Sequence, residues 1–340
     1  MRRVYIVTGA YGHLGSTIVR KLKETGARVR ALILPQDKLA GSEQMDIELV
    51  EGDVRNKESM RPLFEGLDAD EVVVIHTAAI VDIRAEVSPN TYEVNVNGTK
   101  NLIELCLEHQ IHRYIHVSSV HAIPEPKDLR VIKETKDFSP DTVSGNYAKT
   151  KAEASRYVMN CIREKGLPAI ILHPSGIIGP CDPGRNHIVQ GIIKYLNGEM
   201  PTCPNAGYDF VDVRDVADAC IAAVDKGRVG ETYILSNRHY SMPELFKMLH
   251  LITGQKAMRY YIPMWVCKAA ASISESLAKR SKVPPSFTKY SLETLESNDK
   301  FSCEKAVKEL GYKNTDMYDT LKDTAVWLSQ QKLIRSQEKL

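Results

Sequence analysis

Tyr147 and Lys151 are four residues apart, and their side chains are the ones in this sequence best suited to proton transfer. Residues at this spacing share one face of a helix, so the phenol and the ammonium would point the same way. Lowering the pKa of a phenol from about 10 to about 7 needs roughly 4 kcal/mol in favour of the phenolate. A nearby ammonium can contribute to that stabilisation. The pair predicts an acid/base centre, and Ser119, at the end of an earlier predicted strand, is a candidate donor to a substrate oxygen.

A glycine-rich turn, Thr8 to Gly15, opens the chain directly after a predicted strand. Gly9, Gly12 and Gly15 follow a G-x-x-G-x-x-G spacing, not the commoner G-x-G-x-x-G. Glycines let the backbone approach a pyrophosphate, and the next helix offers free N–H groups and the positive end of its dipole. The turn therefore predicts a dinucleotide cradle, while an ordinary strand–helix turn packed by glycines is the alternative.

The type of nicotinamide cofactor is poorly determined by the second predicted strand. At its end, NAD sites usually hold an acid for the ribose hydroxyls and NADP sites an arginine for the 2′-phosphate. This chain has Ile33 and Leu34 there, and their apolar side chains can bind neither group. Lys38 lies just beyond and could meet a 2′-phosphate or simply be solvated. We expect NADP or NAD, with a slight preference for NADP. Asp53, after the third strand, is a candidate contact of the adenine, with a turn aspartate as the alternative.

The amino-terminal half alternates short β-branched runs with segments of helical period. Strands are predicted over residues 3–7, 28–34, 47–51, 72–76, 114–118 and 169–173, and helices over 13–24, 91–108 and 147–164. This alternation implies βαβ units and an α/β fold with a doubly wound parallel sheet of the Rossmann type. Further helices are predicted over residues 241–253, 265–279 and 315–328.

The later helices predict a smaller, mainly helical lobe at the carboxyl edge of the sheet, where doubly wound folds bind their ligands. We expect residues 1–174 and 205–240 to form the NAD(P)-binding domain. We expect residues 175–204 and 241–330 to form the substrate-binding lobe.

Composition excludes several classes of protein. A net charge of +2 over 340 residues gives no electrostatic case for nucleic-acid binding. Runs of 18 apolar residues are missing, so no membrane span is expected, and the first residues lack a signal-peptide pattern. An odd number of cysteines without a Cys-x-x-Cys pair predicts a reduced, cytoplasmic protein with no zinc site. These cysteines are Cys106, Cys161, Cys181, Cys203, Cys220, Cys267 and Cys303.

Over about residues 3–240 the chain resembles the extended short-chain dehydrogenases/reductases of the NAD-dependent epimerase/dehydratase superfamily. The matching segments are 8–15, 52–54, 76–79, 95–99, 117–119, 147–151, 173–176, 210–217 and 230–233. The resemblance implies that Tyr147 is the acid/base, that Lys151 holds the nicotinamide ribose and tunes Tyr147, and that Ser119 binds the reacting oxygen. It also implies a homodimer formed through the two long helices.

The other residues predicted at the cofactor come from the cradle and from the resemblance together. They are Gly9, Tyr11, Gly12, His13, Leu14, Lys38, Asp53, Val54, Thr77, Ala78, Ala79, Asn95, Ser118, Pro174 and Ser175. Among them, the resemblance gives Asn95 a structural or relay position.

Two branches of the superfamily compete for the substrate. Sugar-nucleotide epimerases and dehydratases need cations for a diphosphate. They often carry an arginine where this chain has Tyr208, although Arg185 could compensate. Members similar to dihydroflavonol 4-reductase and 3β-hydroxysteroid dehydrogenase act on carbonyls of less polar substrates. Predicted substrate contacts are Val81, His121, Arg185 and Tyr208.

Apolar residues of the lobe could line a substrate pocket or pack the lobe's own core. They are Met200, Tyr208, Tyr260, Tyr261, Met264, Trp265 and Phe287. We favour an NAD(P)-dependent oxidoreductase that interconverts a carbonyl and an alcohol on a small, fairly apolar substrate. A nucleotide-sugar epimerase or dehydratase is the alternative, and a non-catalytic NAD(P)-sensing or scaffold protein is the second.

Overall fold

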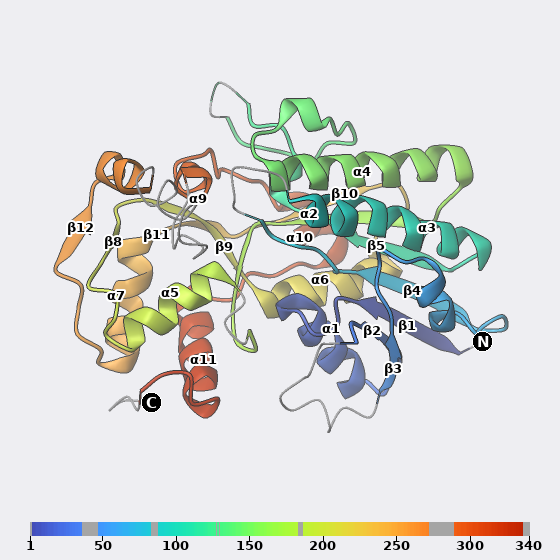
Figure 1. The fold of residues 1–340 in the computed structure, drawn as a ribbon, viewed down its shortest axis with the longest axis horizontal. Helices are drawn as coiled ribbons and strands as arrows, with labels where there is room; N and C mark the ends of the chain where they lie inside the picture. The colour runs from blue at the N-terminus through green and yellow to red at the C-terminus, as the bar shows by residue number, and fades with distance from the viewer. Residues whose placement is uncertain are drawn as a thin grey trace.

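A seven-stranded parallel sheet forms the centre of the molecule (Figure 1). The computed structural model describes residues 2–35, 47–82, 88–126, 128, 130–182, 186–271 and 289–335. The strands stand in the order β10-β6-β5-β4-β1-β2-β3. Their bounds are β1 Arg3–Thr8, β2 Arg28–Ile33, β3 Glu48–Glu51, β4 Glu71–His76, β5 Arg113–Val117, β6 Ala169–Pro174 and β10 Thr232–Leu235. The predicted doubly wound sheet is confirmed.

Most of the central strands are buried on both faces, which explains their continuous runs of Val and Ile. Helices α3 (Gly98–Glu108) and α4 (Asn146–Lys165) cover one face, and α1 (His13–Glu24) and α6 (Val213–Lys226) cover the other (Figure 1). The strand order reverses between β1 and β4, so the carboxyl ends of these strands lie at the topological switch point where such sheets bind ligands.

The predicted helix over residues 91–108 is interrupted. It comprises α2 (Pro89–Tyr92), a five-residue π-helical segment η3 (Glu93–Asn97) and then α3. Single π turns inside helices are frequent at functional sites because they redirect a side chain. Here the π turn carries Asn95, which is buried. Short 3₁₀ helices are η2 (Glu58–Leu63), η4 (Val120–Ala122) and η5 (Pro140–Thr142).

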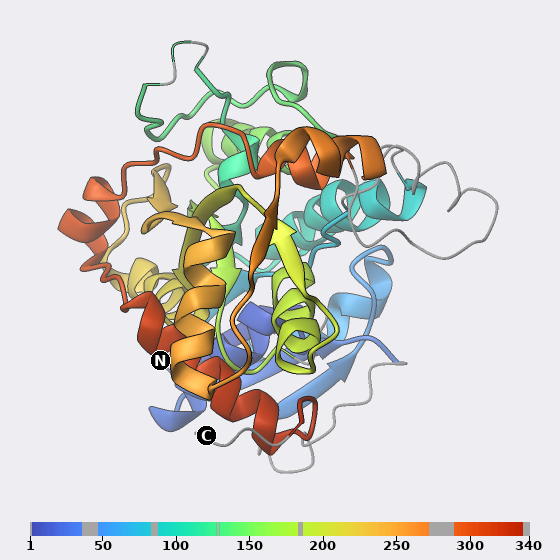
Figure 2. The ribbon, with the colours of Figure 1, turned by 90° about the vertical axis from the view of Figure 1, so that its left-hand side faces the viewer.

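The second lobe contains more strand than the sequence predicts (Figure 2). One three-stranded sheet has the order β11-β9-β7, and β12 pairs with β8. The bounds are β7 Gly176–Ile178, β8 Thr202–Pro204, β9 Gly207–Asp212, β11 Arg238–Ser241 and β12 Tyr260–Ile262. Strands β7, β8, β10, β11 and β12 have only three or four residues, too few to establish a period of two, and the six residues of β9 are buried throughout and show no alternation either.

Helices of the lobe surround these small sheets. Their bounds are α5 His187–Leu196, α7 Met242–Thr253, α9 Lys289–Thr294 and α11 Met317–Gln330. Helices α7 and α11 confirm the predictions over 241–253 and 315–328. The predicted helix over 265–279 is present at residues 264–271, and its remainder lies outside the described residues. None of the helices within the described ranges is long and apolar enough to cross a membrane.

The two lobes share structure. Along β9, Tyr208 and Phe210 belong to the core of the lobe, whereas Val211 belongs to the core between the sheet and α1 and α6. Helix α10 (Glu304–Leu310) lies between the lobe helices α9 and α11 in sequence but packs against β10 and α6. The division at residues 174, 205 and 240 remains a prediction, and the packing of α10 suggests adding residues 304–312 to the sheet domain.

Candidate active site

Helix α4 positions Tyr147 and Lys151 over the end of β5. The helix begins after Gly145, whose φ of +89° is readily adopted by glycine. Tyr147 is 9% exposed and Lys151 is 5% exposed. The Lys151 Nζ donates to the carbonyl of Val117, the last residue of β5, at 2.9 Å. The ammonium therefore lies at the strand end that leads directly to Ser118 and Ser119.

Burial changes the acidity of the lysine. Loss of hydration disfavours the ammonium and lowers the pKa of Lys151 to about 8. Val117 is the hydrogen-bond partner found for Nζ within the described part of the chain, which leaves two N–H donors for a ligand or water. A desolvated cation beside Tyr147 can stabilise negative charge on the phenol oxygen.

Ser119, which follows β5, is fixed by hydrogen bonds with His121 and with His173 of β6. Its Oγ accepts a hydrogen bond from the backbone N–H of His121 at 3.3 Å. Its carbonyl lies 2.9 Å from Nδ1 of His173, which therefore carries the proton. The preceding Ser118 is paired through its Oγ with Ser155 Oγ on α4 at 2.7 Å. These contacts fix the serine segment between β6 and α4.

Aromatic rings form one wall beside Tyr147. The ring of His121 meets that of Tyr147 edge-on at 6.3 Å between centroids. On its other side His121 stacks on Tyr208 at 5.6 Å, with an interplanar angle of 11°. Desolvation lowers the pKa of His121 to about 4, so the imidazole is neutral at pH 7. Of the other predicted substrate contacts, Val81 is exposed, and Arg185 lies outside the described residues.

The glycine turn is packed so closely that side chains cannot be added at two of its positions. Gly9 has φ +67°, and a Cβ there would lie 2.8 Å from the backbone nitrogen of Ala78. At Gly15 a Cβ would lie 2.1 Å from the carbonyl oxygen of Gly9. Gly12 is less confined, with 3.2 Å to the same oxygen. Bare backbone at the N-terminus of α1, at the sheet's switch point, fits a dinucleotide pyrophosphate.

Several other predicted cofactor contacts surround this turn. Thr77 donates through Oγ1 to the carbonyl of Thr8 at 2.7 Å, and the N–H of Ala78 approaches Thr8 Oγ1 at 3.3 Å. Ala79 is partly exposed next to them. Tyr11 and Leu14 are buried in the core beneath α1. These hydrogen bonds join the start of the glycine turn, at Thr8, to the loop after β4.

Two further sets of predicted cofactor contacts are His13, at the start of α1, and Asp53 and Val54, just after β3. His13 Nε2 lies 3.0 Å from the carbonyl of Pro180, and its Nδ1 lies 3.7 Å from Asp182 of the second lobe. Asp53 is paired with Arg55, which holds the pKa of this carboxyl below its usual range. Val54 is buried. Lys38, the candidate for a 2′-phosphate, lies outside the described residues.

Asn95 is engaged entirely by protein. Its Oδ1 accepts from the backbone N–H of Ile80 at 2.8 Å. Its Nδ2 donates to the carbonyl of Ile80 and to Thr150 Oγ1, both at 3.0 Å. The residue thus joins the loop after β4 to α4, and the structural or relay position that the resemblance gives it stays a prediction.

Sequence reasoning missed Asp209, which is buried beneath Ser175. The Ser175 hydroxyl donates to Asp209 Oδ1, and the backbone N–H of Asn237 donates to the same oxygen at 3.1 Å. Burial raises the pKa of Asp209 to about 6. Ser175 follows Pro174 at the end of β6, so this carboxylate orients a predicted nicotinamide contact. An acid within the apolar strand Gly207–Asp212 was the available signal.

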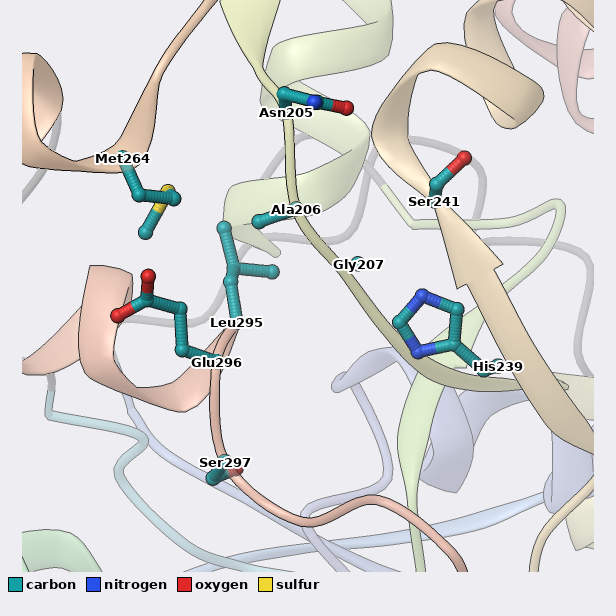
Figure 3. Close-up of a pocket in the computed structure, with 9 residues that line it drawn as sticks. All are labelled: Asn205, Ala206, Gly207, His239, Ser241, Met264, Leu295, Glu296 and Ser297. Carbon is teal, nitrogen blue, oxygen red and sulfur yellow. The ribbon is translucent and has the colours of Figure 1, made fainter.

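A groove of about 670 Å³ is lined by residues 205–207, 239, 241, 264 and 295–297 (Figure 3). Asn205 and His239 line one side, and Met264 and Glu296 line the other. Tyr147, Lys151 and Ser119 are not among its lining residues. Of the proposed apolar pocket residues, Met264 borders this groove, whereas Tyr260 and Trp265 are exposed. Within the described chain, no group of three or more His, Cys, Asp or Glu could hold a metal ion.

Known proteins resemble this chain along nearly its whole length. Sterol demethylase protein B of Methylococcus capsulatus is 30% identical over 333 residues, covering 97% of this chain and 99% of that protein. A putative dihydroflavonol 4-reductase of Synechocystis is 27% identical over 345 residues, covering 99% and 98%. The crystal structure of gox2253 superposes with a TM-score of 0.83 at 32% identity, covering 98% of this chain and 99% of that one.

The family match agrees with the cradle, the sheet order and the Tyr147–Lys151 pair. The sequence profile described as the NAD dependent epimerase/dehydratase family matches residues 5–236, about two thirds of the chain. This range includes every predicted catalytic residue. The chain therefore belongs to the NAD-dependent epimerase/dehydratase family and is an extended short-chain dehydrogenase/reductase.

Proposed function

We propose that this protein is an NAD(P)-dependent oxidoreductase that interconverts a carbonyl and an alcohol on a small, fairly apolar substrate. The observation that carries the proposal is the buried Tyr147–Lys151 pair, set beside Ser119 and a wall of stacked rings. The similarity to proteins named putative dihydroflavonol 4-reductase and sterol demethylase protein B supports a substrate of low polarity.

The residues present fit a nicotinamide dinucleotide. The turn from Gly9 to Gly15 would hold its pyrophosphate, Lys151 its nicotinamide ribose, and Pro174 and Ser175 its carboxamide. When bound, the cofactor supplies the hydride for reduction or accepts it in oxidation. The slight preference for NADP is proposed on Lys38 alone, so fluorescence titration with NADPH and NADH would test it directly.

The protein's own groups would manage the proton. Ser119 and Tyr147 would donate hydrogen bonds to the substrate oxygen, and Tyr147 would transfer its proton to that oxygen as it gains charge. Lys151 would stabilise the phenolate left behind, with an attraction strengthened by the buried setting. His121 and Tyr208 would press against a flat apolar substrate and exclude water.

One observation weighs against the nucleotide-sugar alternative. Tyr208 stands where sugar-nucleotide enzymes often carry a phosphate-binding arginine, and it is buried against His121. A diphosphate would therefore depend on Arg185 or on another cation of the second lobe. The sensor alternative is opposed by the presence of the complete Ser119, Tyr147 and Lys151 set.

The deciding experiment is a substrate panel of sterols, aryl aldehydes and UDP-sugars, each assayed with both cofactors. We expect stoichiometric oxidation of NAD(P)H with an apolar ketone or aldehyde. Conversion of a UDP-sugar without net change in the cofactor would instead support a nucleotide-sugar epimerase or dehydratase. Cofactor binding without turnover of any compound would favour the sensor.

Two further properties are proposed. We propose a homodimer built on α3 and α4, as the family resemblance implies, which sedimentation equilibrium would test. A cytoplasmic location rests on the odd, scattered cysteine set, and fractionation of the native host would test it.

A further inference from the structure

Three large aromatic side chains are exposed within a short stretch of the second lobe. Trp265 is 75% exposed, Tyr260 is 73% exposed and Tyr261 is 44% exposed. The two tyrosines belong to β12, and Trp265 lies in the helix of residues 264–271 that follows this strand. Figure 1 shows β12 at the end of the molecule away from the seven-stranded sheet. Single apolar residues are common on protein surfaces, but a cluster of exposed rings indicates an interaction surface.

The helix of residues 264–271 exposes an apolar side. Its exposed residues are Trp265, Ala269 and Ala270, whereas Ala271 is buried. A surface helix of a globular protein normally turns polar side chains to water, so this arrangement is the reverse of the usual one. Lys268 is only partly exposed, and it forms an ion pair with Glu296. The outer side of this helix is therefore suited to an apolar partner.

Cationic side chains accompany the exposed rings. From Leu245 to Ala271 the chain has four lysines or arginines and no aspartate or glutamate, although the net charge of the whole chain is only +2. Lys256 and Arg259 are exposed close to Tyr260 in the sequence. Within the described residues, neither of these two cations is paired with a carboxylate. The stretch is therefore both aromatic and positively charged.

This charge distinguishes between possible partners. A contact between two copies through this surface would bring the cations of both copies into one interface, which is unfavourable. An anionic partner would instead attract them. Trp and Tyr gather at the boundary between lipid headgroups and acyl chains, and neighbouring Lys and Arg bind anionic headgroups. Exposed rings beside unpaired cations therefore fit a bilayer better than a second copy.

We propose that this part of the lobe docks on the surface of an anionic lipid bilayer. The residues that would make the contact, which we call the docking surface, are Lys256, Arg259, Tyr260, Tyr261 and Trp265. The rings would enter the headgroup region, while the two cations would pair with anionic headgroups. The inference goes beyond the proposed oxidoreduction, because docking needs neither cofactor nor substrate.

A groove beside the docking surface gives the contact a use. Met264, next to the exposed tryptophan, lines the groove of about 670 Å³ (Figure 3). Gly207 lines the same groove, and the residue after it, Tyr208, stacks on His121 in the wall of the proposed active site. If the proposed function holds, docking would bring this lobe to carbonyl compounds dissolved in the bilayer.

Co-sedimentation of the full chain with lipid vesicles tests the docking surface. One set of vesicles contains phosphatidylcholine alone, and the other contains phosphatidylcholine mixed with anionic phosphatidylglycerol. We expect at least about tenfold tighter binding to the mixed vesicles, since each cation near an anionic surface contributes roughly fivefold. Added salt should weaken this binding by screening. Failure to bind the mixed vesicles at low salt would overturn the proposal.

Two double variants assign the binding to this surface. Tyr260→Ser with Trp265→Ser removes the most exposed rings, and Lys256→Gln with Arg259→Gln removes the cations. Each pair should lower affinity for the mixed vesicles about tenfold or more. All four side chains are exposed, so the thermal midpoints should stay close to wild type. Wild-type affinity in either double variant would overturn the proposal.

Matched controls replace exposed residues of the same types elsewhere. Tyr318→Ser removes an exposed tyrosine of α11, and Lys308→Gln with Lys322→Gln removes two exposed lysines of α10 and α11. These controls should bind the mixed vesicles as the wild type does. Losses equal to those of the docking-surface variants would overturn the assignment, because they would indicate binding without a defined surface.

Trp265 also provides a direct spectroscopic readout. The chain has two tryptophans, and the other, Trp327, packs against the core of the lobe. In the Trp327→Phe variant, Trp265 is the single tryptophan, and we expect its emission to shift to the blue with mixed vesicles. Sedimentation with vesicles but no shift would overturn docking through this ring. A blue shift on raising the protein concentration without lipid would overturn it too, because a second copy would then cover the surface.

These measurements separate docking from the proposed function. If no carbonyl compound is reduced, the proposed function fails, while vesicle binding still decides the inference. If a water-soluble aldehyde is reduced but vesicles are not bound, only the inference fails. If both hold, Tyr260→Ser with Trp265→Ser should raise KM about tenfold for a ketone dissolved in vesicles and leave the kinetics with the soluble aldehyde unchanged.

Discussion

A phenol can act as the acid of this site only if its oxygen is held beside a cation and away from bulk water. Tyr147 meets the second condition through burial, and Lys151 supplies the cation, fixed to the end of β5 by Val117. Because burial brings the pKa of Lys151 to about 8, the ammonium itself titrates close to physiological pH. The pair is therefore sensitive both to removal of either member and to pH.

Tyr147→Phe should lower turnover at least about a hundredfold, in line with the usual contribution of a general acid. NADPH and NADH affinities should change little because the ring remains. Tyr157→Phe, on the same helix, is the matched control and should retain full activity. Steady-state kinetics with fluorescence titration checks both points, and wild-type turnover in the Tyr147→Phe enzyme would remove Tyr147 from the role.

Lys151→Met should weaken cofactor binding and shift the pH optimum upward, since the phenol loses the cation that favours its ionised form. In the wild type, kcat/KM for reduction should fall above a pH of about 8 as the ammonium is lost. That descending limb should be missing in the Met variant. An identical pH profile for the two proteins would contradict the tuning role of Lys151.

At the level of elements, the turn between β1 and α1 is preorganised by contact with the loop after β4. Gly15 lies against the carbonyl of Gly9, and Gly9 lies against Ala78. The positive φ of Gly9 adds a second constraint, since a side chain there would be strained even with more space. Gly12 has no positive φ and more space for a side chain than Gly9 or Gly15. A substitution at Gly12 can therefore test ligand binding with little effect on stability.

Gly9→Ala and Gly15→Ala should lower the thermal midpoint, since each added methyl overlaps backbone. Gly12→Ala should keep a midpoint close to wild type but weaken NADPH binding, because its methyl would occupy the space of the pyrophosphate. Differential scanning calorimetry and titration distinguish the two effects. Wild-type affinity in Gly12→Ala would argue against a cradle at this turn.

Much of the sheet was predictable, while the partners of the site residues were not. The run Val72 to Ile75 is apolar and β-branched because both its faces are buried, and such runs identify strands directly. The position of Asn95 in a π turn leaves no such pattern. His173 and Asp209 contact Ser119 and Ser175 across gaps of 54 and 34 residues, which only the tertiary structure reveals.

For the whole molecule, buried neutral histidines link stability to pH. Desolvation lowers the folded pKa of His76 to about 3 and of His121 and His173 to about 4, and it places that of His116 well below its usual value. The unfolded chain takes up these protons near pH 6.5, so stability falls as the pH drops below that value. The raised pKa of Asp209, about 6, acts in the opposite direction.

Urea denaturation should therefore show a free energy of unfolding that decreases from pH 6.5 to pH 4.5. His116→Phe should reduce the slope of the unfolding free energy against pH by the equivalent of about one bound proton, since one buried histidine is removed. Tyr114→Phe, on the same strand, should leave the slope unchanged. An unaltered slope in His116→Phe would mean that His116 is protonated equally in both states.

Strand β9 gives the two lobes a common wall. Alternate residues along it serve different cores, with Tyr208 and Phe210 on one side and Val211 on the other. Grafting residues 175–204 alone from a relative, to exchange substrate preference, would pack the grafted segment against the β9 side chains of the recipient protein. Chimeras designed with junctions beyond both ends of β9 would keep these contacts matched, and recombination in this family should favour the same crossover points.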